Sequence, residues 1–290
     1  MITITAATGR YGRLVIDALL KRGVPAHEVV AAVRDPGKAS DLAAKGLKVR
    51  EADYDRPETL ASAFAGADKI LLVPSADFGR RYSQMQRAVN AAVEAQVGLI
   101  AYAGFVNGET STLLLGDEHK QTEEAITATG LPHIFLRNGA YIEVYAGDLG
   151  DIGYALTAGE LMGAAANGYV SGASRADLAE AAAVVLSSEA EGNAVYELAG
   201  TSFTMTDMAA TISKLTGKPL VYQDMPVEQY RQVLATFMPG FLAEIVADAS
   251  FATQRGDWFS ESTDLERLLG RPTTPLAEVV SVTLKRNGLI

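Results

Sequence analysis

The sequence contains no cysteine and only three histidines, His27, His119 and His133. Neither a disulfide framework nor a thiolate zinc site is therefore possible, and we expect no metal site. Basic side chains are also scarce: 25 Lys and Arg stand against 35 Asp and Glu, a formal net charge of -10. Because nucleic-acid binding depends on clustered Lys and Arg, this balance argues against a nucleic-acid partner.

Long hydrophobic runs are missing as well. No segment approaches the roughly 18 apolar residues that a membrane span requires, and the first residues lack the basic and apolar regions of a signal peptide. We expect a cytoplasmic protein with no membrane partner. The composition, 48% hydrophobic and 21% charged residues, is typical of globular proteins. A chain of 290 residues is long enough for one main domain and a smaller lobe.

Short β-branched or apolar runs alternate with helical patterns in the first half of the chain, as in βαβ units. The runs that predict strands cover residues 1–6, 28–34, 47–52, 68–74 and 97–103. The patterns that predict helices cover residues 11–21, 36–45, 57–64 and 80–96. Because parallel strands need right-handed crossovers, these helices must lie on both faces of the sheet. The sequence predicts an α/β fold with a Rossmann-type, doubly wound parallel sheet.

The alternation ends after a predicted helix over residues 117–129 and a strand over 133–137. Beyond them the pattern predicts two isolated strands, over residues 195–198 and 220–223. It also predicts three helices, over residues 206–215, 227–234 and 241–255. We therefore divide the chain into a dinucleotide-binding domain, residues 1–150, and a mainly substrate-binding part, residues 151–290. The second part forms a smaller, helix-rich C-terminal lobe, from which later segments can return to the sheet of the first domain.

A glycine turn between the first strand and the first helix predicts a nucleotide site. Gly9 lets the backbone approach a pyrophosphate, Gly12 lets the helix pack closely on the strand, and Thr8 offers a hydroxyl donor. Ala6 stands where the first glycine of this spacing is usual. Alanine is tolerated there if its φ is negative, whereas a positive φ costs about 1 kcal/mol or more.

The end of the second strand indicates which dinucleotide is bound. A site specific for NAD(H) places Asp or Glu there to bind the ribose 2′-hydroxyl, whereas this strand ends in Arg34. Lys38 follows one helical turn later and adds a second cation for a 2′-phosphate. Asp35 lies beside them and weakens the field. The pattern favours NADP(H) over NAD(H).

Several motifs in order resemble the NmrA-like branch of the atypical short-chain dehydrogenases/reductases, in particular its quinone- and triphenylmethane-reducing members. They read TAATGRYG at 5–12, VRDPGKA at 33–39, READY at 50–54, IAY at 100–102, DEHKQTE at 117–123, FLRNGAY at 135–141, YELAG at 196–200 and LGRPTTPLAE at 269–278. The resemblance covers essentially the whole chain. It implies a monomer or homodimer that uses NADPH to reduce a quinone or another conjugated aromatic compound.

The resemblance also implies roles for individual residues. Gly9, Gly12, Arg34 and Lys38 would hold the phosphates, and Asp53 and Tyr54 would border the adenine. Pro74 and Ser75 would line the path to the nicotinamide. The further cofactor-binding candidates are Thr8, Arg10, Tyr11 and Tyr102. His119, Asn138 and Tyr141 would face the acceptor as catalytic candidates, His119 as a possible proton donor.

The acid–base pair of typical short-chain dehydrogenases is absent. None of the eleven tyrosines has Lys four residues later, and residues 102–104 offer no serine to polarise a substrate oxygen. An electron-poor quinone does not need them, since the protein has mainly to orient two planar rings. Tyr141 and Tyr145 are four residues apart and would share a helix face. Phe237, Met238 and Phe241 would form a lid or only a corner between helices.

Two other functions remain open at this stage. The first is a tailoring enzyme, for example an oxygenase, that acts on a polycyclic aromatic metabolite. Ala6 and Ala103 motivate it, because both depart from the usual pattern. The second is a non-enzymatic regulator that senses NAD(P) and binds a partner protein.

Overall fold

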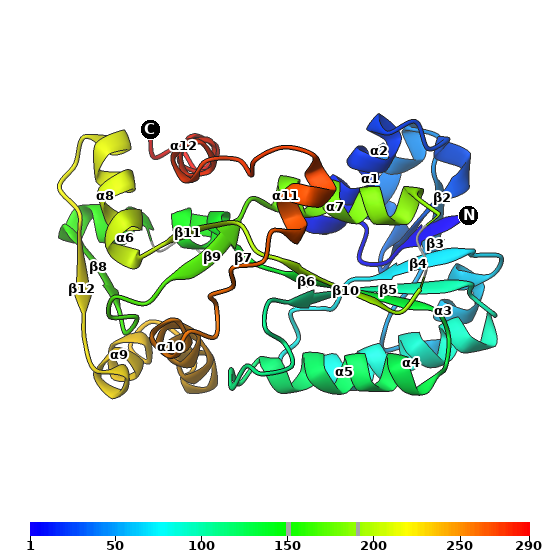
Figure 1. Cartoon of the computed structure of the whole chain (residues 1–290), viewed down its shortest axis with the longest axis horizontal. Helices are drawn as coiled ribbons and strands as arrows, with labels where there is room; N and C mark the ends of the chain where they lie inside the picture. The colour runs from blue at the N-terminus through cyan, green and yellow to red at the C-terminus, as the bar shows by residue number, and fades with distance from the viewer. Residues whose placement is uncertain (149–151, 190–191) are drawn as a thin grey trace.

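The computed structural model describes residues 1–148, 152–189 and 192–290 (Figure 1). The described residues form a central seven-stranded sheet in the order β10-β6-β5-β4-β1-β2-β3, and every neighbouring pair is parallel. Its strands are β1 (Ile2–Ile4), β2 (Val29–Val33), β3 (Lys48–Glu51), β4 (Lys69–Leu72), β5 (Leu99–Phe105), β6 (His133–Asn138) and β10 (Ala194–Leu198). The predicted Rossmann-type sheet is confirmed.

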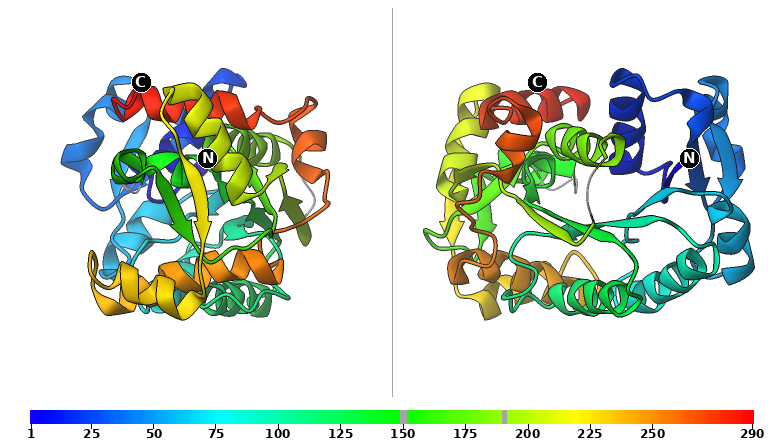
Figure 2. Two further views of the ribbon diagram at one scale, coloured as in Figure 1. Left: turned by 90° about the vertical axis from the view of Figure 1, so that its left-hand side faces the viewer. Right: turned by 45° about the vertical axis from the view of Figure 1, so that its right-hand side comes forward.

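Helices cover both faces of this sheet (Figures 1 and 2). One face carries α1 (Arg10–Lys21) and α7 (Arg175–Ser187), which pack on each other, and the other carries α3 (Pro57–Phe64), α4 (Arg81–Glu94) and α5 (Gly116–Ala128). In α1 the apolar residues Val15, Ile16 and Leu19 recur at helical spacing and are fully buried. At the sheet edge the chain forms η1 (Ala26–Glu28), η2 (Pro36–Ala39) and α2 (Ser40–Ala44).

The C-terminal lobe has its own core. A three-stranded sheet in the order β11-β9-β7 and a parallel pair β12-β8 pack with short helices around Ile142, Phe203 and Met208. The strands are β7 (Ala140–Tyr141), β8 (Glu160–Gly163), β9 (Val170–Ala173), β11 (Thr201–Phe203) and β12 (Val221–Asp224). The helices are the π-helical η3 (Val144–Asp148), α6 (Ile152–Ala158), α8 (Met205–Thr216), α9 (Val227–Leu234), α10 (Gly240–Arg255) and α12 (Leu276–Arg286). Between them, α11 (Asp264–Leu269) packs on α7 and β10 of the nucleotide-binding part.

The two strands predicted as isolated are both paired. β10 joins the central sheet beside β6, with Val195 opposite Phe135, and β12 pairs with β8. The second half of the chain thus supplies β10 and α7 to the nucleotide-binding part, so a boundary near residue 150 separates the cores only approximately. Short strands of this kind take their partner from tertiary packing, which a local pattern does not contain. Within the described residues, no helix is long and apolar enough to cross a membrane.

Candidate functional site

The order of the central sheet reverses between β1 and β4. Thr5, just after β1, joins the ends of these two strands: its N–H donates to the carbonyl of Leu71 at 3.1 Å, and its hydroxyl accepts the N–H of Val73 at 2.8 Å. Open α/β sheets bind ligands outside the carboxyl ends of their strands at such a reversal. The predicted glycine turn, residues 6–12, lies at this position.

The turn is shaped by a residue in the left-handed region. Ala6 has a φ of +46°, and its carbonyl accepts the N–H of Gly9 at 2.8 Å. A Cβ on Gly12 would lie 2.7 Å from the carbonyl oxygen of Ala6 and 2.9 Å from the Cα of Ala7. Gly12 is therefore required for the close approach of α1 to the turn. Ala6 carries the strain that its positive φ implies.

The N-terminus of α1 opens on the turn. Gly9 is its N-cap, no side chain caps the helix, and the first turn contains no acidic residue. Gly9 is exposed and Thr8 is half-buried. Free backbone N–H groups at the positive end of a helix form a site for a phosphate. The exposed Gly9 and the uncapped start of α1 fit the pyrophosphate of a dinucleotide, and Gly12 lets the helix lie against the turn.

The side chains of Arg10 and Tyr11 are already engaged. The guanidinium of Arg10 pairs with Asp148, which also pairs with Arg175 and Arg286. Tyr11 is buried, and its hydroxyl donates to the carbonyl of Leu178 in α7 at 3.4 Å. Both residues thus anchor the first turn of α1, and their backbone N–H groups are the parts that face the turn.

The end of β2 presents unpaired positive charge. Arg34 is exposed and has no hydrogen bond or ion pair among the described residues. The ammonium of Lys38 lies 3.9 Å from Asp35, while the other carboxylate oxygen of Asp35 accepts the N–H of Gly37 at 3.0 Å. Asp35 is therefore used to cap η2, and Arg34 remains available for an anion.

Arg13 is a residue that the sequence analysis missed. Its guanidinium donates to the carbonyl of Thr8 and to the carbonyl of Lys38, each at 3.2 Å, and pairs with Asp41. One side chain thus joins the glycine turn to the segment after β2. The partners lie up to 28 residues apart, and no local motif signals such a contact.

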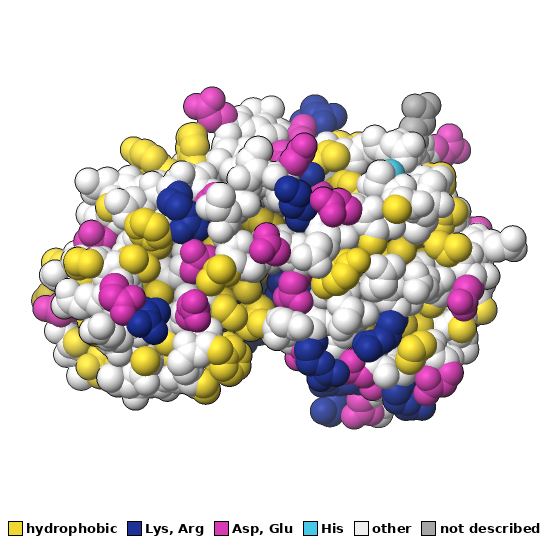
Figure 3. All heavy atoms as spheres, turned by 90° about the horizontal axis from the view of Figure 1, so that it is seen from below, with side chains coloured by type: hydrophobic (Ala, Val, Ile, Leu, Met, Phe, Trp, Pro, Cys, Tyr) yellow, Lys and Arg dark blue, Asp and Glu magenta, His cyan; other side chains and the backbone are white. Residues whose placement is uncertain are grey.

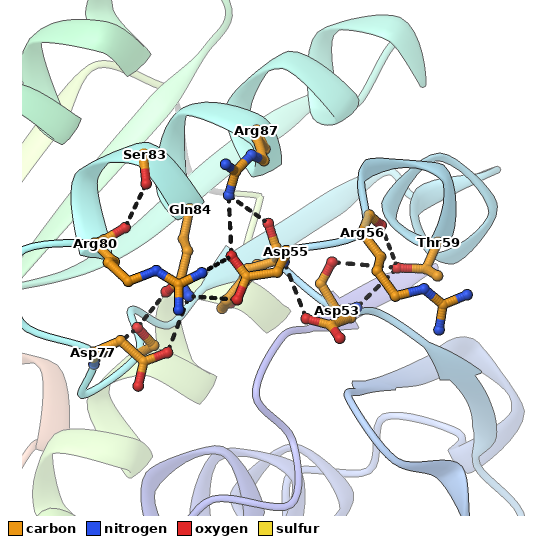
Figure 4. A network of polar contacts seen from close by, with 11 residues as sticks. Asp53, Asp55, Arg56, Thr59, Asp77, Arg80, Ser83, Gln84 and Arg87 are labelled. Carbon is orange, nitrogen blue, oxygen red and sulfur yellow. Dashed lines mark hydrogen bonds and ion pairs between the residues drawn. The ribbon is translucent and has the colours of Figure 1, made fainter.

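The segments after β3 and β4 are tied by a polar network (Figure 4). The carboxylate of Asp55 accepts hydrogen bonds from Arg80 at 2.8 Å, Arg87 at 3.2 Å and Gln84 at 3.3 Å. Asp53 accepts the N–H of Asp55 at 3.0 Å. The network holds Asp53 at the end of the crevice beside β3, where the resemblance puts the adenine.

Tyr54 and Ser75 belong to the same wall. The hydroxyl of Tyr54 donates to the carbonyl of Val73 at 2.7 Å, and Ser75 donates to Gln84 at 2.5 Å. Burial raises the pKa of the Tyr54 hydroxyl, so it stays protonated and continues to donate. Pro74 is half-buried between them. These contacts fix the course of the chain from β4 toward α4.

His119 lies in a chain of hydrogen bonds that crosses from α4 to β5. Arg81 donates from Nε to the carbonyl of Ser75 at 2.9 Å, and its Nη1 lies 3.1 Å from Nε2 of His119. Nδ1 of His119 lies 2.7 Å from the hydroxyl of Tyr102. Because arginine only donates, Nε2 is the acceptor and Nδ1 carries the hydrogen.

The surroundings keep this imidazole neutral. Burial and, secondarily, the neighbouring Arg81 cation lower the pKa of His119 to about 3. Tyr102 is fully buried on the sheet face that α4 and α5 cover. His119 and Tyr102 therefore support the β4–α4 segment from behind. In this arrangement His119 is not charged at neutral pH, which removes an imidazolium acid from the candidate chemistry.

Asn138 and Tyr141 lie on the other side of the crevice, where β6 leads into the lobe. The amide nitrogen of Asn138 lies 3.4 Å from the hydroxyl of Tyr141, and the buried amide oxygen of Asn138 has no hydrogen-bond partner. The ring of Tyr141 lies 6.2 Å from that of Tyr11, and the guanidinium of Arg175 lies 4.6 Å from its centre. The amide of Asn138 is thus only partly satisfied, at the point where β6 leads into the lobe.

The predicted helix face shared by Tyr141 and Tyr145 is wrong. Tyr141 belongs to strand β7, whereas Tyr145 lies in η3 and packs edge-to-face on Phe203, with ring centres 5.7 Å apart. Alternating burial and pairing with β9 make residues 140–141 extended. Tyr145 belongs to the core of the lobe and not to the site.

Aromatic side chains of the lobe are exposed at the corner between α9 and α10. Phe237 and Phe241 are 64% and 61% exposed, Met238 is half-buried, and Phe237 contacts Tyr154 of α6 with ring centres 5.7 Å apart. Figure 3 shows a hollow between the two lobes, with hydrophobic side chains on the C-terminal lobe beside it.

A pocket of about 360 Å³ lies between α4, α5 and α10. Its lining includes Phe78, Tyr82, Leu115 and Ile245. The carboxylate of Glu118 accepts the N–H groups of Gly79 and Tyr82 at 3.2 and 3.1 Å, and so caps α4. The lining also includes the polar side chains of Ser83 and Gln121.

The whole chain matches known proteins. The profile of the NmrA-like family matches residues 1–260. Quinone oxidoreductase 2 of Escherichia coli is 43% identical over 97% of this chain and 98% of its own, and an NAD(P)H azoreductase of Xenophilus azovorans is 26% identical over 96% of each.

Solved structures match over the same length. The NADPH complex of the E. coli NADPH-dependent quinone oxidoreductase superposes with a TM-score of 0.93 at 42% identity, covering 97% of this chain and 99% of that one. The NADP(H) complex of the Citrobacter triphenylmethane reductase superposes with a TM-score of 0.92 at 36% identity, covering 98% and 100%. The chain belongs to the NmrA-like family.

Proposed function

We propose that this protein is an NADPH-dependent oxidoreductase that reduces quinones or other flat, conjugated aromatic compounds. The observation that carries the proposal is the pairing of the uncapped glycine turn at Gly9 and Gly12 with the unpaired Arg34 at the end of β2. The names of the relatives point the same way, since they are reductases of quinones, azo compounds and triphenylmethane dyes.

The cofactor supplies a hydride from its nicotinamide ring. The backbone of Gly9 to Gly12 and the hydroxyl of Thr8 hold the pyrophosphate, and Arg10 and Tyr11 anchor the helix turn that presents these N–H groups. Arg34 and Lys38 bind the 2′-phosphate. Arg34 is free to form the paired hydrogen bonds that a guanidinium makes with a phosphate.

The rest of the crevice orients two rings. Asp53 and Tyr54 border the adenine, and Pro74 and Ser75 lead toward the nicotinamide, supported from behind by His119 and Tyr102. Asn138 and Tyr141 face the acceptor. Substrate reduction then depends mainly on holding the acceptor against the nicotinamide and excluding water. Residues 1–150 provide most of the nucleotide site, and the lobe after them covers the acceptor.

The test is binding followed by turnover. Isothermal titration calorimetry with NADPH and NADH should give tighter binding of NADPH, and NADPH oxidation should accelerate when a simple benzoquinone or naphthoquinone is added. Absence of NADPH binding would overturn the proposal. Binding without acceptor reduction would favour a nucleotide-sensing regulator, and oxygen uptake with a hydroquinone but no NADPH would favour an oxygenase.

The expected monomer or homodimer and the cytoplasmic location stay predictions. Sedimentation of the purified protein, with and without NADPH, measures the first. Fractionation of cells that produce it measures the second.

A further inference from the structure

We propose that the hydroxyl of Tyr141 donates the proton that quinone reduction requires, and that Arg175 is the cation that supports this tyrosine. The inference rests on the proposed function and deepens it. It gives the crevice a Tyr–cation pair built from two segments, in a sequence that has no Tyr-x-x-x-Lys motif.

Tyr141 lies next to the nucleotide turn on the side of the acceptor. Its ring contacts Tyr11, which belongs to the first turn of α1, at a centre-to-centre distance of 6.2 Å. It follows β6, on the side of the reversal where β5 and β6 end. The hydroxyl lies 3.4 Å from the amide nitrogen of Asn138, and the ring is half-buried. The side chain is thus held, but not fully enclosed.

Arg175 is fixed against the ring of Tyr141. Its guanidinium lies 4.6 Å from the ring centre, and its side chain is 12% exposed. Its guanidinium pairs with Asp148 and lies 3.9 Å from one carboxylate oxygen of Glu143, while its backbone N–H donates to the other at 2.9 Å. A cation held on an aromatic face in this way stabilises negative charge that develops on the ring oxygen.

The charged groups around Tyr141 come from each element that packs on it. Arg175 of α7 is the nearest cation, and Asp148 of η3 neutralises part of its charge but is itself shared with Arg10 and Arg286. Glu143, whose second oxygen has no hydrogen-bond partner, opposes ionisation of Tyr141, and Tyr141 in turn raises the pKa of the Tyr11 hydroxyl. Burial is the largest effect and raises the pKa of Tyr141, while Arg175 acts in the lowering direction.

The chemistry requires this proton. A hydride carries two electrons and one proton. A quinone that accepts a hydride becomes a hydroquinone monoanion, and one further proton completes the hydroquinone. Tyr141 breaks its O–H bond to supply that proton. The resulting tyrosinate lies next to the Arg175 cation and is then reprotonated by water. Tyr141 is protonated across the neutral range, and Arg175, which lowers its pKa, offsets part of the loss of acidity that burial causes.

Two acceptors separate proton donation from everything else the site does. A cationic triphenylmethane dye becomes neutral on accepting a hydride and needs no proton, whereas a quinone needs one. For each variant we would measure NADPH oxidation with both acceptors on the same preparation, so that any loss of folded protein or of NADPH binding cancels in the ratio of the two rates.

We expect Tyr141→Phe to lower the quinone-to-dye ratio at least tenfold, in line with the contribution of a positioned acid. Tyr145→Phe, which removes a hydroxyl inside the lobe core, is the matched control and should leave the ratio unchanged. Loss of both rates in equal proportion in Tyr141→Phe, or no change in either, would overturn the assignment. If the wild type oxidises NADPH with neither acceptor, it is the proposed function that fails.

The role of Arg175 is that of a positioning residue and has its own test. Arg175→Met should lower the same ratio, whereas Arg175→Lys, which keeps the charge, should restore most of it. NADPH affinity, measured by calorimetry, should change little in both variants because Asp148 keeps Arg10 and Arg286 as partners. A lowered ratio in Met and Lys variants alike would show that charge is not what Arg175 contributes.

Discussion

The carbonyl oxygen of Ala6 lies against the Cα of Gly12, so closely that a Cβ at Gly12 would approach it to 2.7 Å. The two residues therefore constrain each other: Ala6 adopts a φ of +46°, and α1 begins directly over its carbonyl. The shape of the proposed nucleotide turn depends on that contact.

Gly12→Ala should displace the turn, because the new methyl group meets backbone atoms on Ala6 and Ala7 that have no side-chain freedom. We expect NADPH affinity to fall at least tenfold and the free energy of unfolding to fall by roughly 1–3 kcal/mol. Calorimetry and urea unfolding measure the two effects. Gly240→Ala is the matched control, since its Cβ would meet nothing within 4 Å at the start of α10. Wild-type affinity in Gly12→Ala would show that the turn adapts.

Ala6→Gly should relieve strain at the same contact. The left-handed conformation costs a non-glycine residue about 1–2 kcal/mol, and the added freedom of glycine in the unfolded chain offsets part of the gain. We expect the free energy of unfolding to rise by about 0.5–1 kcal/mol. Ala7→Gly, at a buried neighbour without a positive φ, should lower it instead. Urea denaturation of both variants checks the opposite signs, and a loss of stability in Ala6→Gly contradicts the strain.

Arg34→Ala should weaken NADPH binding without weakening NADH binding. The guanidinium is exposed and has no partner among the described residues, so its removal leaves no buried charge behind. A hydrogen bond to a charged group contributes about 1.5–3 kcal/mol, which corresponds to at least a tenfold rise in the NADPH dissociation constant. Arg22→Ala, at the far end of α1, is the control for loss of surface charge. Equal weakening of both cofactors would place the 2′-phosphate elsewhere.

Much of the fold could be predicted because its signals are local. Runs such as Val29–Val33 are fully buried and apolar throughout, and the apolar spacing of α1 fixes its inner face. The pairing of β10 could not be predicted, because only Leu198 of this strand is buried and its partner β6 lies sixty residues earlier, with Val195 opposite Phe135. No periodicity within five residues contains that partner.

The candidate site divides in the same way. Gly9, Gly12 and Arg34 follow from a motif that reads along one strand, one turn and one helix. Arg81 and Arg175 were missed because they act on His119 and Tyr141 across 38 and 34 residues, and an arginine at a helix start is ordinary in any sequence. Sequence reasoning therefore predicted the glycine turn and the cations after β2, and missed the arginines that contact His119 and Tyr141 from distant segments.

Because of His119, the free energy of unfolding should begin to fall at a pH well above the pKa that His119 has in the folded protein. Its pKa is about 3 in the folded state against 6.5 in its ordinary range, because burial and Arg81 disfavour the imidazolium. Between these values the unfolded chain binds a proton that the folded chain does not, so stability falls as pH falls below 6.5 and is constant above it. From pH 7.5 to 5.0 this amounts to roughly 2 kcal/mol. His119→Gln keeps an acceptor for Arg81 and a donor for Tyr102 but does not titrate. The free energy of unfolding of this variant, measured with urea, should therefore fall by about 2 kcal/mol less than that of the wild type over the same interval. Exposed His27→Gln should behave like the wild type, and an unchanged pH dependence in His119→Gln would mean that the imidazole is charged in the fold.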